Sequence, residues 1–329
     1  MPLAVLGAGS WGTALAVQFA RAGRPVRLWG RNRAELASAA RERENRRYLP
    51  GIRLPDNITL EPDLEAALAG AGDILIAVPS GALRETLKRL APLIEGGERI
   101  AWATKGFELE TGKLPHEVVQ EVLGEGHALA VLSGPTFARE VAEGLPTALT
   151  VAANDERFAQ DLARDLSGDS FRAYTSTDIV GVEVGGAVKN VLAIGAGLSD
   201  GLGFGANARI ALINRGLAEM IRLGVALGAR QDTLVGLAGM GDLVLTCTDD
   251  QSRNRRFGLA LAEGRSIAEA EAGIGQVVEG VRAAKAVHQV AERLGVEMPI
   301  CEQVYRILYE GVSPREAVSR LMSRELKPE

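Results

Sequence analysis

The chain has few of the residues that build disulfide frameworks and metal sites. Only two of its 329 residues are cysteine, Cys247 and Cys301, and only three are histidine. Neither type is clustered at metal-ligand spacing, so we expect no metal ion. The formal net charge is −5, which argues against a nucleic-acid partner, because phosphate neutralisation needs an excess of basic side chains.

Targeting and membrane segments are also lacking. The first apolar run already begins at Leu3 and leaves no room for a signal peptide. Glycines and charges interrupt the longer apolar stretches, which we expect to fall short of membrane-spanning length. We therefore expect a cytoplasmic protein without membrane insertion. A length of 329 residues, 47% of them hydrophobic and only 4% aromatic, predicts two domains with cores of small aliphatic side chains.

The most informative motif that is present is a glycine-rich turn near the N-terminus, between a strand-like run and a helical pattern. Gly7, Gly9 and Gly12 form G-x-G-x-x-G directly after the apolar run 3–6. In dinucleotide-binding domains the first glycine permits the tight turn, the second lets the pyrophosphate approach the backbone, and the third lets the helix pack on the strand. The amides of the helix N-terminus then face the phosphates. The alternative is an ordinary glycine-rich turn.

The residues after the second expected strand bear on the choice of cofactor. The run 25–29 ends in Gly30-Arg31-Asn32-Arg33, where an NAD-selective domain carries an acid for the ribose hydroxyl. Arg31 and Arg33 stand there instead, and guanidinium groups suit the extra phosphate of NADP. We predict NADP(H) as the preferred cofactor, with NAD(H) as an accepted alternative. The competing interpretation is a solvated loop.

The order of the remaining patterns predicts an α/β fold followed by an all-α part. Further strands are expected at 73–78, 99–104, 128–132 and 148–152, with helices such as 81–94 and 114–123 between them. This alternation predicts a Rossmann-type, doubly wound, mostly parallel sheet whose ligands lie beyond the carboxyl ends of the strands. From Ile179 onward only helical patterns remain. We predict a dinucleotide-binding Rossmann domain over 1–179 and a helical substrate-binding and catalytic domain over 180–329.

Lysine is scarce enough to be informative. Only six of the 37 basic residues are lysine, and two of these stand in apolar or glycine-rich settings. Lys189 lies in a helical segment among Gly, Ala and Leu, where desolvation is expected to lower its pKa towards working pH. Lys105 ends the run Trp102–Gly106, at a strand end. Both can exchange protons, which arginine cannot do near neutral pH. The alternatives are a Lys189 that reaches solvent on its apolar stem and a Lys105 that is simply exposed.

Three other polar motifs are candidates for substrate binding. Ser133-Gly134-Pro135-Thr136 precedes a short helix whose free amides could bind an anion, although a plain helix cap fits equally well. The run Ser252-Arg253-Asn254 offers a hydroxyl, a guanidinium and an amide before a helix and could grip a phosphate, or could be solvated surface. Asp242 ends a tight Gly-Met-Gly turn and could orient Lys189 or hold a substrate hydroxyl.

Together these motifs resemble those of a known family. The runs GAGSWGTALA, WATKG, SGPTFA, GGAVKNVLAIGAGLSDGLGFGANA, GDLVLTCTDDQSRNRRFG and GQVVEG are similar to those of the bacterial NAD(P)-dependent glycerol-3-phosphate dehydrogenases. The resemblance extends from the first strand to about residue 320. It implies interconversion of sn-glycerol 3-phosphate and dihydroxyacetone phosphate, which supplies the backbone of glycerophospholipids. It also implies a Rossmann domain, a helical domain and a homodimer.

The resemblance assigns roles residue by residue. Lys189 matches the proton acceptor of the family, and we predict catalytic roles for Lys189, Lys105 and Asp242. Substrate contacts are expected at Lys105, Gly134, Thr136, Lys189, Asp242, Ser252, Arg253 and Asn254. Cofactor contacts are expected at Gly7, Gly9, Ser10, Trp11, Gly12, Arg31, Arg33, Lys105, Ala138, Arg253, Val277 and Glu279.

Two other functions stay open at this point. One is a different two-domain dehydrogenase that acts on a 3-hydroxy acid or a sugar acid phosphate, which would also need a lysine beside its substrate. The other is a non-catalytic NADPH-sensing protein. The Ser252–Asn254 motif disfavours the first, and a lysine in an apolar helix disfavours the second, because its desolvation would cost stability without serving chemistry.

Overall fold

The computed structural model describes residues 1–323. Contacts divide the chain into two compact units. The first consists of residues 1–105 and 114–182, and the second consists of residues 106–113 together with the chain from Glu183 onward. Each unit is described in turn.

The first unit is built on one eight-stranded sheet in the order β3-β2-β1-β4-β5-β6-β7-β8. Its strands are β1 (Leu3–Leu6), β2 (Val26–Trp29), β3 (Ile58–Glu61), β4 (Asp73–Ile76), β5 (Arg99–Trp102), β6 (Leu129–Ser133), β7 (Thr147–Ala153) and β8 (Phe171–Ser176). All neighbouring pairs are parallel except β6 and β7, which are antiparallel. Every residue of β1, β4 and β6 is buried, as expected of parallel strands covered on both faces.

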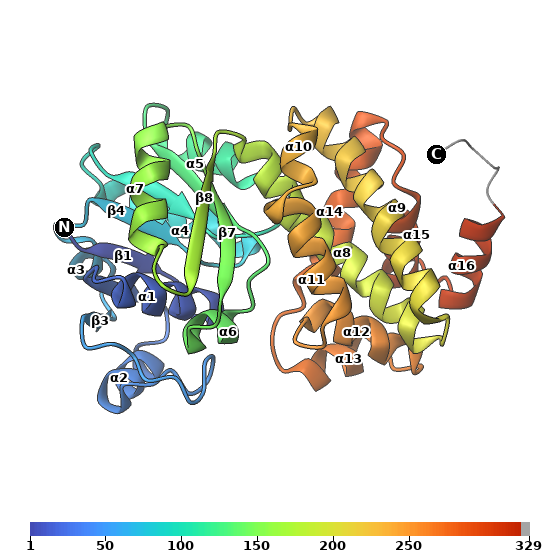
Figure 1. The fold of residues 1–329 in the computed structure, drawn as a ribbon, viewed down its shortest axis with the longest axis horizontal. Helices are drawn as coiled ribbons and strands as arrows, with labels where there is room; N and C mark the ends of the chain where they lie inside the picture. The colour runs from blue at the N-terminus through green and yellow to red at the C-terminus, as the bar shows by residue number, and fades with distance from the viewer. Residues whose placement is uncertain (324–329) are drawn as a thin grey trace. The chain divides into compact units, whose positions relative to one another are not determined.

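Helices cover both faces of this sheet (Figure 1). They are α1 (Ser10–Arg21), α2 (Arg33–Glu42), α3 (Leu64–Leu68), α4 (Ser80–Leu90), the short η1 (Ala91–Leu93), α5 (Pro115–Leu123), α6 (Ala138–Glu143) and α7 (Glu156–Leu166). The strand order runs one way from β1 to β3 and the other way from β4 to β6. Right-handed crossovers therefore place α1 and α4 on opposite faces and create a switch point between β1 and β4, where such sheets bind ligands.

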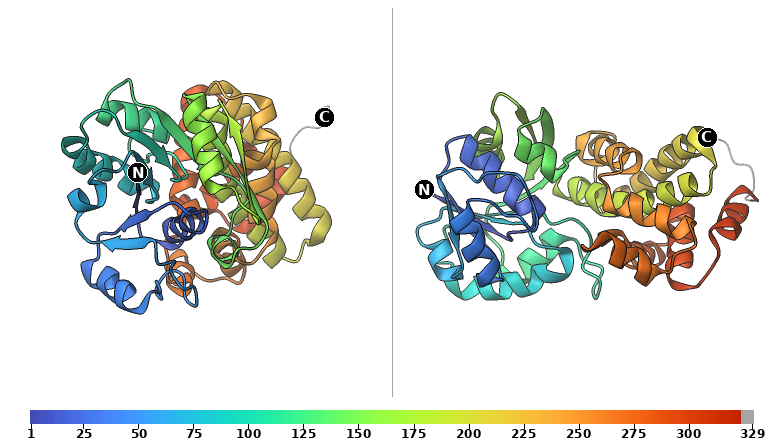
Figure 2. Two further views of the ribbon diagram at one scale, coloured as in Figure 1. Left: turned by 60° about the vertical axis from the view of Figure 1, so that its left-hand side comes forward. Right: turned by 90° about the horizontal axis from the view of Figure 1, so that it is seen from below.

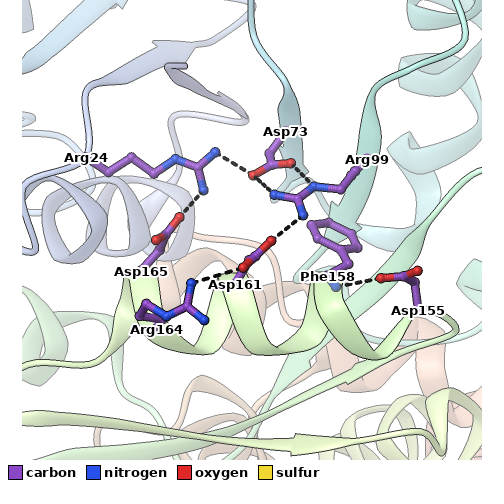
Figure 3. A network of polar contacts seen from close by, with 8 residues as sticks. All are labelled: Arg24, Asp73, Arg99, Asp155, Phe158, Asp161, Arg164 and Asp165. Atoms are coloured by element: carbon purple, nitrogen blue, oxygen red, sulfur yellow. Dashed lines mark hydrogen bonds and ion pairs between the residues drawn. The ribbon is translucent and has the colours of Figure 1, made fainter.

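A network of charges lies at the amino ends of β4 and β5, the edge opposite to that switch point (Figure 3). Asp73 accepts hydrogen bonds from Arg24 at 2.5 Å and from Arg99 at 2.6 Å. Arg24 also bonds Asp165 at 2.5 Å, and Arg99 bonds Asp161 at 2.7 Å. The Arg99 guanidinium lowers the pKa of the Asp161 carboxyl below its ordinary value. The network joins β4 and β5 to α7 and to the connection between α1 and β2, away from the expected ligand edge.

The second unit is helical, as Figure 2 shows from two further sides. Its elements are α8 (Ile179–Gly201), α9 (Gly205–Ala226), α10 (Gln231–Leu234), a π-helical turn η2 (Leu237–Gly241), α11 (Asp242–Thr248), α12 (Arg253–Ala262), α13 (Ile267–Ile274), α14 (Glu279–Leu294), α15 (Pro299–Tyr309) and α16 (Pro314–Met322). Residues 181–199 of α8 are all buried, so this helix is the centre of the unit.

Glycines let other elements approach the backbone of α8. A Cβ at Gly185 would collide with the carbonyl oxygen of Ala238, and one at Gly197 would collide with that of Arg255. Helix α8 is also long and apolar enough to cross a membrane by length and composition, with 89% of its most apolar window buried inside the protein. The expectation that no apolar stretch reaches spanning length is thus wrong for this segment, and its burial is typical of a core helix.

A short segment from the middle of the sheet domain packs with the helices. Residues 106–113 form a loop closed by a hydrogen bond from the Glu108 amide to the Lys113 carbonyl, 2.9 Å. Arg293 of α14 donates to the Thr111 carbonyl at 3.1 Å. The division predicted from sequence had assigned this segment to the N-terminal domain.

The predicted fold class is confirmed, because a mostly parallel sheet with flanking helices precedes an all-helical part. The strands β3 and β8 were not expected. The antiparallel pair of β6 and β7 is compatible with the mostly parallel sheet that was predicted.

Candidate active site

The glycine-rich turn between β1 and α1 has the geometry that a dinucleotide site requires. Gly7 has a φ of +125°, and a Cβ there would collide with the carbonyl oxygen of Ala77. A Cβ at Gly12 would collide with the carbonyl oxygen of Gly7. By contrast, apart from Gly9 and its two chain neighbours, no residue has an atom within 4 Å of a Cβ placed on Gly9. Packing therefore requires the first and third glycines, whereas the second leaves open backbone that a pyrophosphate can approach.

The first turn of α1 keeps its amides available. Gly9 is the N-cap and supplies no side-chain hydrogen bond, so the first amides depend on other partners. Ser10 donates its hydroxyl to the Tyr48 carbonyl at 2.8 Å. The indole Nε1 of Trp11 is buried and has no hydrogen-bond partner among the described residues. An anion placed here would meet the positive end of the α1 dipole.

The end of β2 carries basic and no acidic side chains. Arg31 and Arg33 are both exposed, on either side of Asn32. The Asn32 side chain caps α2 by accepting hydrogen bonds from the amides of Ala34 and Glu35. The cap fixes the backbone between the two exposed arginines.

A second cluster of predicted residues lies beyond β5 and β6. Lys105 follows β5, and its Nζ approaches the Gly134 carbonyl at 3.5 Å. Thr136 donates its hydroxyl to the same carbonyl at 3.1 Å. Ser133 ends β6 with a buried hydroxyl that has no partner among the described residues. Ala138 is the first residue of α6. Because β5 and β6 are parallel neighbours, their carboxyl ends bring these residues together at one edge.

In the helical unit, Lys189 is buried against a carboxylate. Only 8% of Lys189 and 1% of Asp242 are exposed. The Lys189 Nζ donates to Asp242 Oδ1 at 2.5 Å and to Thr246 Oγ1 at 2.9 Å. Thr246 in turn donates to the Asp242 backbone carbonyl at 2.6 Å. The side chain of Lys189 does not run out to solvent, which was the alternative left open by the sequence.

These contacts define the electrostatics around Lys189. Burial disfavours the ammonium form, whereas the adjacent carboxylate of Asp242 stabilises it. Cys247 is nearby and fully buried, and burial raises the pKa of its thiol to about 12 despite the opposing charge of Lys189. The thiol is therefore neutral near pH 7.

The sequence analysis gave no role to two residues that the structure brings into this region. Thr246 contacts Lys189 from one turn beyond Asp242 on α11. Asn190 Oδ1 accepts a hydrogen bond from Asn254 Nδ2 at 2.8 Å, and Asn254 Oδ1 accepts one from the Gly280 amide at 2.9 Å. Both residues stood inside quoted motifs, but no spacing in the sequence pairs 190 with 254.

The start of α12 holds the expected phosphate-binding motif. Ser252 is the N-cap, and its Oγ accepts a hydrogen bond from the Arg255 amide at 3.2 Å. Arg253 is half-buried and donates to Gln276 Oε1 at 3.3 Å. This bond connects α12 to the polar segment 276–280, which contains the exposed Val277 and the half-buried Glu279.

The predicted site residues thus fall into two sets. The first unit holds the glycine turn, the two arginines after β2, Lys105, Gly134, Thr136 and Ala138. The second unit holds Lys189, Asp242, Ser252, Arg253, Asn254, Val277 and Glu279. Within residues 1–323, no group of three or more His, Cys, Asp or Glu side chains could hold a metal ion.

Comparison with known proteins gives one consistent family. Residues 2–159 match the family model described as NAD-dependent glycerol-3-phosphate dehydrogenase N-terminus, and residues 178–319 match that of its C-terminus. A protein of Pseudoalteromonas translucida named glycerol-3-phosphate dehydrogenase, NAD(P)+, is 57% identical over 99% of this chain and 97% of its own length. Its namesake from Alkalilimnicola ehrlichii is 60% identical over 98% of this chain and 97% of its own length.

Solved structures agree with these relatives. The crystal structure of glycerol-3-phosphate dehydrogenase from Coxiella burnetii has a TM-score of 0.95 and 51% identity, covering 98% of this chain and 99% of that one. D-mandelate dehydrogenase, in its ternary complex with NADH and anilino(oxo)acetate, has a TM-score of 0.62 at 15% identity and covers 97% of this chain and 99% of that one. The latter shares the fold alone.

Proposed function

The chain belongs to the family of NAD-dependent glycerol-3-phosphate dehydrogenases, and from this premise we propose that it reduces dihydroxyacetone phosphate to sn-glycerol 3-phosphate with Lys189 as general acid. The observation that carries the role of Lys189 is its burial against Asp242 and Thr246. A lysine serving only packing or solubility would gain nothing from that desolvation. In the reverse direction Lys189 is the general base.

The proton chemistry follows from these contacts. When bound, the reduced nicotinamide supplies the hydride that the ketone carbon receives. The Lys189 ammonium donates a proton to the ketone oxygen, and the neutral amine takes a proton from the hydroxyl in the reverse direction. Asp242 and Thr246 hold Nζ in place, and Asp242 stabilises the ammonium until the proton is transferred. General acid–base catalysis of this kind contributes about 10² to 10⁴ in rate.

Cofactor binding is proposed for the glycine turn and the arginines of the first unit. The open backbone at Gly9 and the N-terminus of α1 suit a pyrophosphate. Arg31 and Arg33 favour the additional phosphate of NADP(H) over NAD(H), because two exposed guanidinium groups stand where an acid would select NAD(H). Trp11 offers a buried N–H donor in the same turn.

Substrate binding is proposed for the polar groups at α12 and beyond β5 and β6. Ser252, Arg253 and Asn254 are proposed to hold the phosphate, and Lys105, Gly134 and Thr136 are proposed to contact the substrate. We also propose that the product supplies glycerophospholipid synthesis, that the protein is a cytoplasmic homodimer, and that it neither inserts into membranes nor binds nucleic acid. These last proposals rest on the family resemblance and on the charge of −5.

The first test is direct. Purified protein is mixed with dihydroxyacetone phosphate and either NADPH or NADH, and the loss of nicotinamide absorbance is followed. Rapid oxidation that requires the phosphorylated ketone supports the activity, and the two rates rank the cofactors. NADPH binding without turnover would instead favour the sensor alternative.

The role of Lys189 is tested by Lys189→Arg, which keeps the positive charge but cannot exchange a proton near neutral pH. We expect kcat to fall by about 10² or more. The matched control is Lys88→Arg, because Lys88 is an exposed residue of α4 that pairs with Glu85. Near-normal turnover of Lys189→Arg would contradict the proposed proton transfer.

A further inference from the structure

Asn45 makes a buried connection to the glycine-rich turn that none of the proposed roles uses. It lies beyond α2, and only 8% of it is exposed. Its Nδ2 donates to the Ala8 carbonyl at 3.0 Å and to Thr13 Oγ1 at 2.9 Å. Ala8 lies between the first two glycines of the turn, and Thr13 lies in the first turns of α1. The two amide protons therefore bridge the two ends of the expected pyrophosphate-binding segment.

The orientation of the Asn45 amide is fixed by its partners. A carbonyl oxygen can only accept a hydrogen bond, so the atom facing Ala8 must be the nitrogen. The Asn45 backbone carbonyl also accepts hydrogen bonds from the amides of Tyr48 at 3.2 Å and Leu49 at 2.8 Å. The turn 45–49 is thereby closed on itself, and the buried Leu49 anchors it in the core of the first unit.

The same turn contacts the glycine-rich segment a second time. The Ser10 hydroxyl donates to the Tyr48 carbonyl at 2.8 Å. Three side-chain hydrogen bonds thus join 45–48 to residues 8–13, and all of them lie within the first unit.

Peptide geometry shows what the bond to Ala8 controls. In a planar trans peptide the carbonyl and the following N–H point in opposite directions. When Asn45 holds the Ala8 carbonyl, the Gly9 N–H must point away from Asn45. Gly9 is also open to its surroundings, because a Cβ added to it would meet no atom within 4 Å apart from its chain neighbours. The hydrogen bond from Asn45 to the Ala8 carbonyl therefore turns the Gly9 N–H away from Asn45, at the residue where the backbone is open.

We propose that Asn45 is a positioning residue for the dinucleotide, which holds the Ala8–Gly9 peptide so that the Gly9 N–H faces the pyrophosphate. The inference rests on the proposed cofactor site but goes beyond it, because Asn45 itself does not touch the cofactor. Without Asn45 the peptide can rotate, and the site loses a donor that was oriented before the anion arrived. Cofactor affinity should fall, whereas the proton chemistry at Lys189 should not change.

The test is the Kd of NADPH, measured by nicotinamide fluorescence without substrate, for wild type and Asn45→Ala. We expect the Kd to rise about tenfold or more, since hydrogen bonds to charged groups are worth about that factor. At saturating NADPH, kcat should stay within about twofold, which a general loss of structure would not allow. Asn45→Asp retains the shape without donors and places a negative charge near the pyrophosphate, so its Kd should rise further.

The matched control is Asn57→Ala. The Asn57 Nδ2 also donates to two acceptors, the carbonyls of Ala20 at 2.9 Å and Arg24 at 3.1 Å, but at the other end of α1. We expect this variant to lose thermal stability and to keep its NADPH Kd within about twofold.

Equal affinity in wild type and Asn45→Ala, or an equal loss in Asn57→Ala, would overturn the proposal. If Asn45→Ala does not fold, the Asn45→Asp variant decides. A wild type that does not bind NADPH would refute the proposed cofactor site itself, and so the two failures are distinguishable.

Discussion

Replacing Asp73 with asparagine should destabilise the sheet unit substantially without changing its ligand chemistry. The Asp73 side chain is only 2% exposed, and the two arginine side chains that it joins are 12% exposed for Arg24 and 31% exposed for Arg99. Removing one partner of a buried charge network typically costs about 3–5 kcal/mol, because the remaining charge is left without compensation. In the variant Arg24 still pairs with Asp165 and Arg99 still pairs with Asp161. We therefore expect a loss of unfolding free energy at the lower end of this range, about 3 kcal/mol.

Thermal unfolding followed by circular dichroism measures this loss. In domains of 150–250 residues each kcal/mol shifts the Tm by about 2–4 °C, so the expected fall is about 6–12 °C. Asp161→Asn is the matched control, because the Asp161 side chain is 26% exposed and Arg99 would keep Asp73. Partly exposed pairs contribute about 0–1 kcal/mol, so this variant should lose only a few degrees.

The position of the network gives a second readout. Asp73 is the first residue of β4 and Arg99 the first of β5, at the end opposite to the proposed cofactor edge. The Kd of folded Asp73→Asn for NADPH should therefore stay within about twofold of wild type. A Tm within about 2 °C of wild type would refute the assigned cost, which requires about 6 °C.

Three further predictions follow from buried groups and from the proposed site. Burial raises the pKa of Glu219, which accepts the amides of Ile300 and Cys301, from 4.5 to about 6. The protonated carboxyl of Glu219 therefore contributes fully to the free energy of unfolding below about pH 4.5. This free energy falls by about 2 kcal/mol as the pH rises through 6 and the carboxyl ionises. The free energy of unfolding in urea should lack this fall in Glu219→Gln between pH 4.5 and 6.5. The same pH dependence in wild type and variant would contradict the assignment to Glu219. Burial raises the thiol pKa of Cys247 and Cys301, so Ellman's reagent should react only after unfolding, and a fast thiol in the native protein would be inconsistent with this. Arg253→Ala should raise the KM for dihydroxyacetone phosphate about tenfold to a hundredfold, and an unchanged KM would remove Arg253 from the phosphate site.

The sequence predicted the interior of the sheet better than its edges. The strands β1, β4, β5 and β6 are mainly apolar, apart from polar residues at strand ends such as Asp73 and Arg99, because parallel interior strands are covered on both faces. At the edges, β8 buries only Phe171, and β3 alternates less clearly. Edge strands need no continuous apolar run, so the pattern that identifies interior strands cannot find them. The antiparallel direction of β7 has no signature in its own residues either.

For the site, the sequence singled out Lys189 and Asp242 and offered their pairing as one possibility, which the structure contains, but it did not predict the other contacts. Lysine scarcity singled out Lys189, and a tight turn singled out Asp242. The contact with Thr246 joins residues 57 positions apart, and the bond between Asn190 and Asn254 joins residues 64 apart. Helix packing creates both pairs, and no local rule specifies which faces of α8, α11 and α12 meet. The sequence analysis also underestimated the apolar length of α8, a helix that is buried inside the protein.

The segment 106–113 has a consequence for how this protein can be divided or recombined. The chain passes from one unit to the other after residues 105, 113 and 182. The helical unit is therefore not encoded by one continuous segment of the sequence. A fragment beginning at 183 would lack the loop whose carbonyl accepts the Arg293 guanidinium and whose Gly112 lies against Val290. A chimera of two related proteins joined between residues 182 and 183 would combine the α14 of one parent with the loop 106–113 of the other. Substitutions in α14 and in this loop are therefore expected to affect each other, although Arg293 and Thr111 lie 182 positions apart in the sequence.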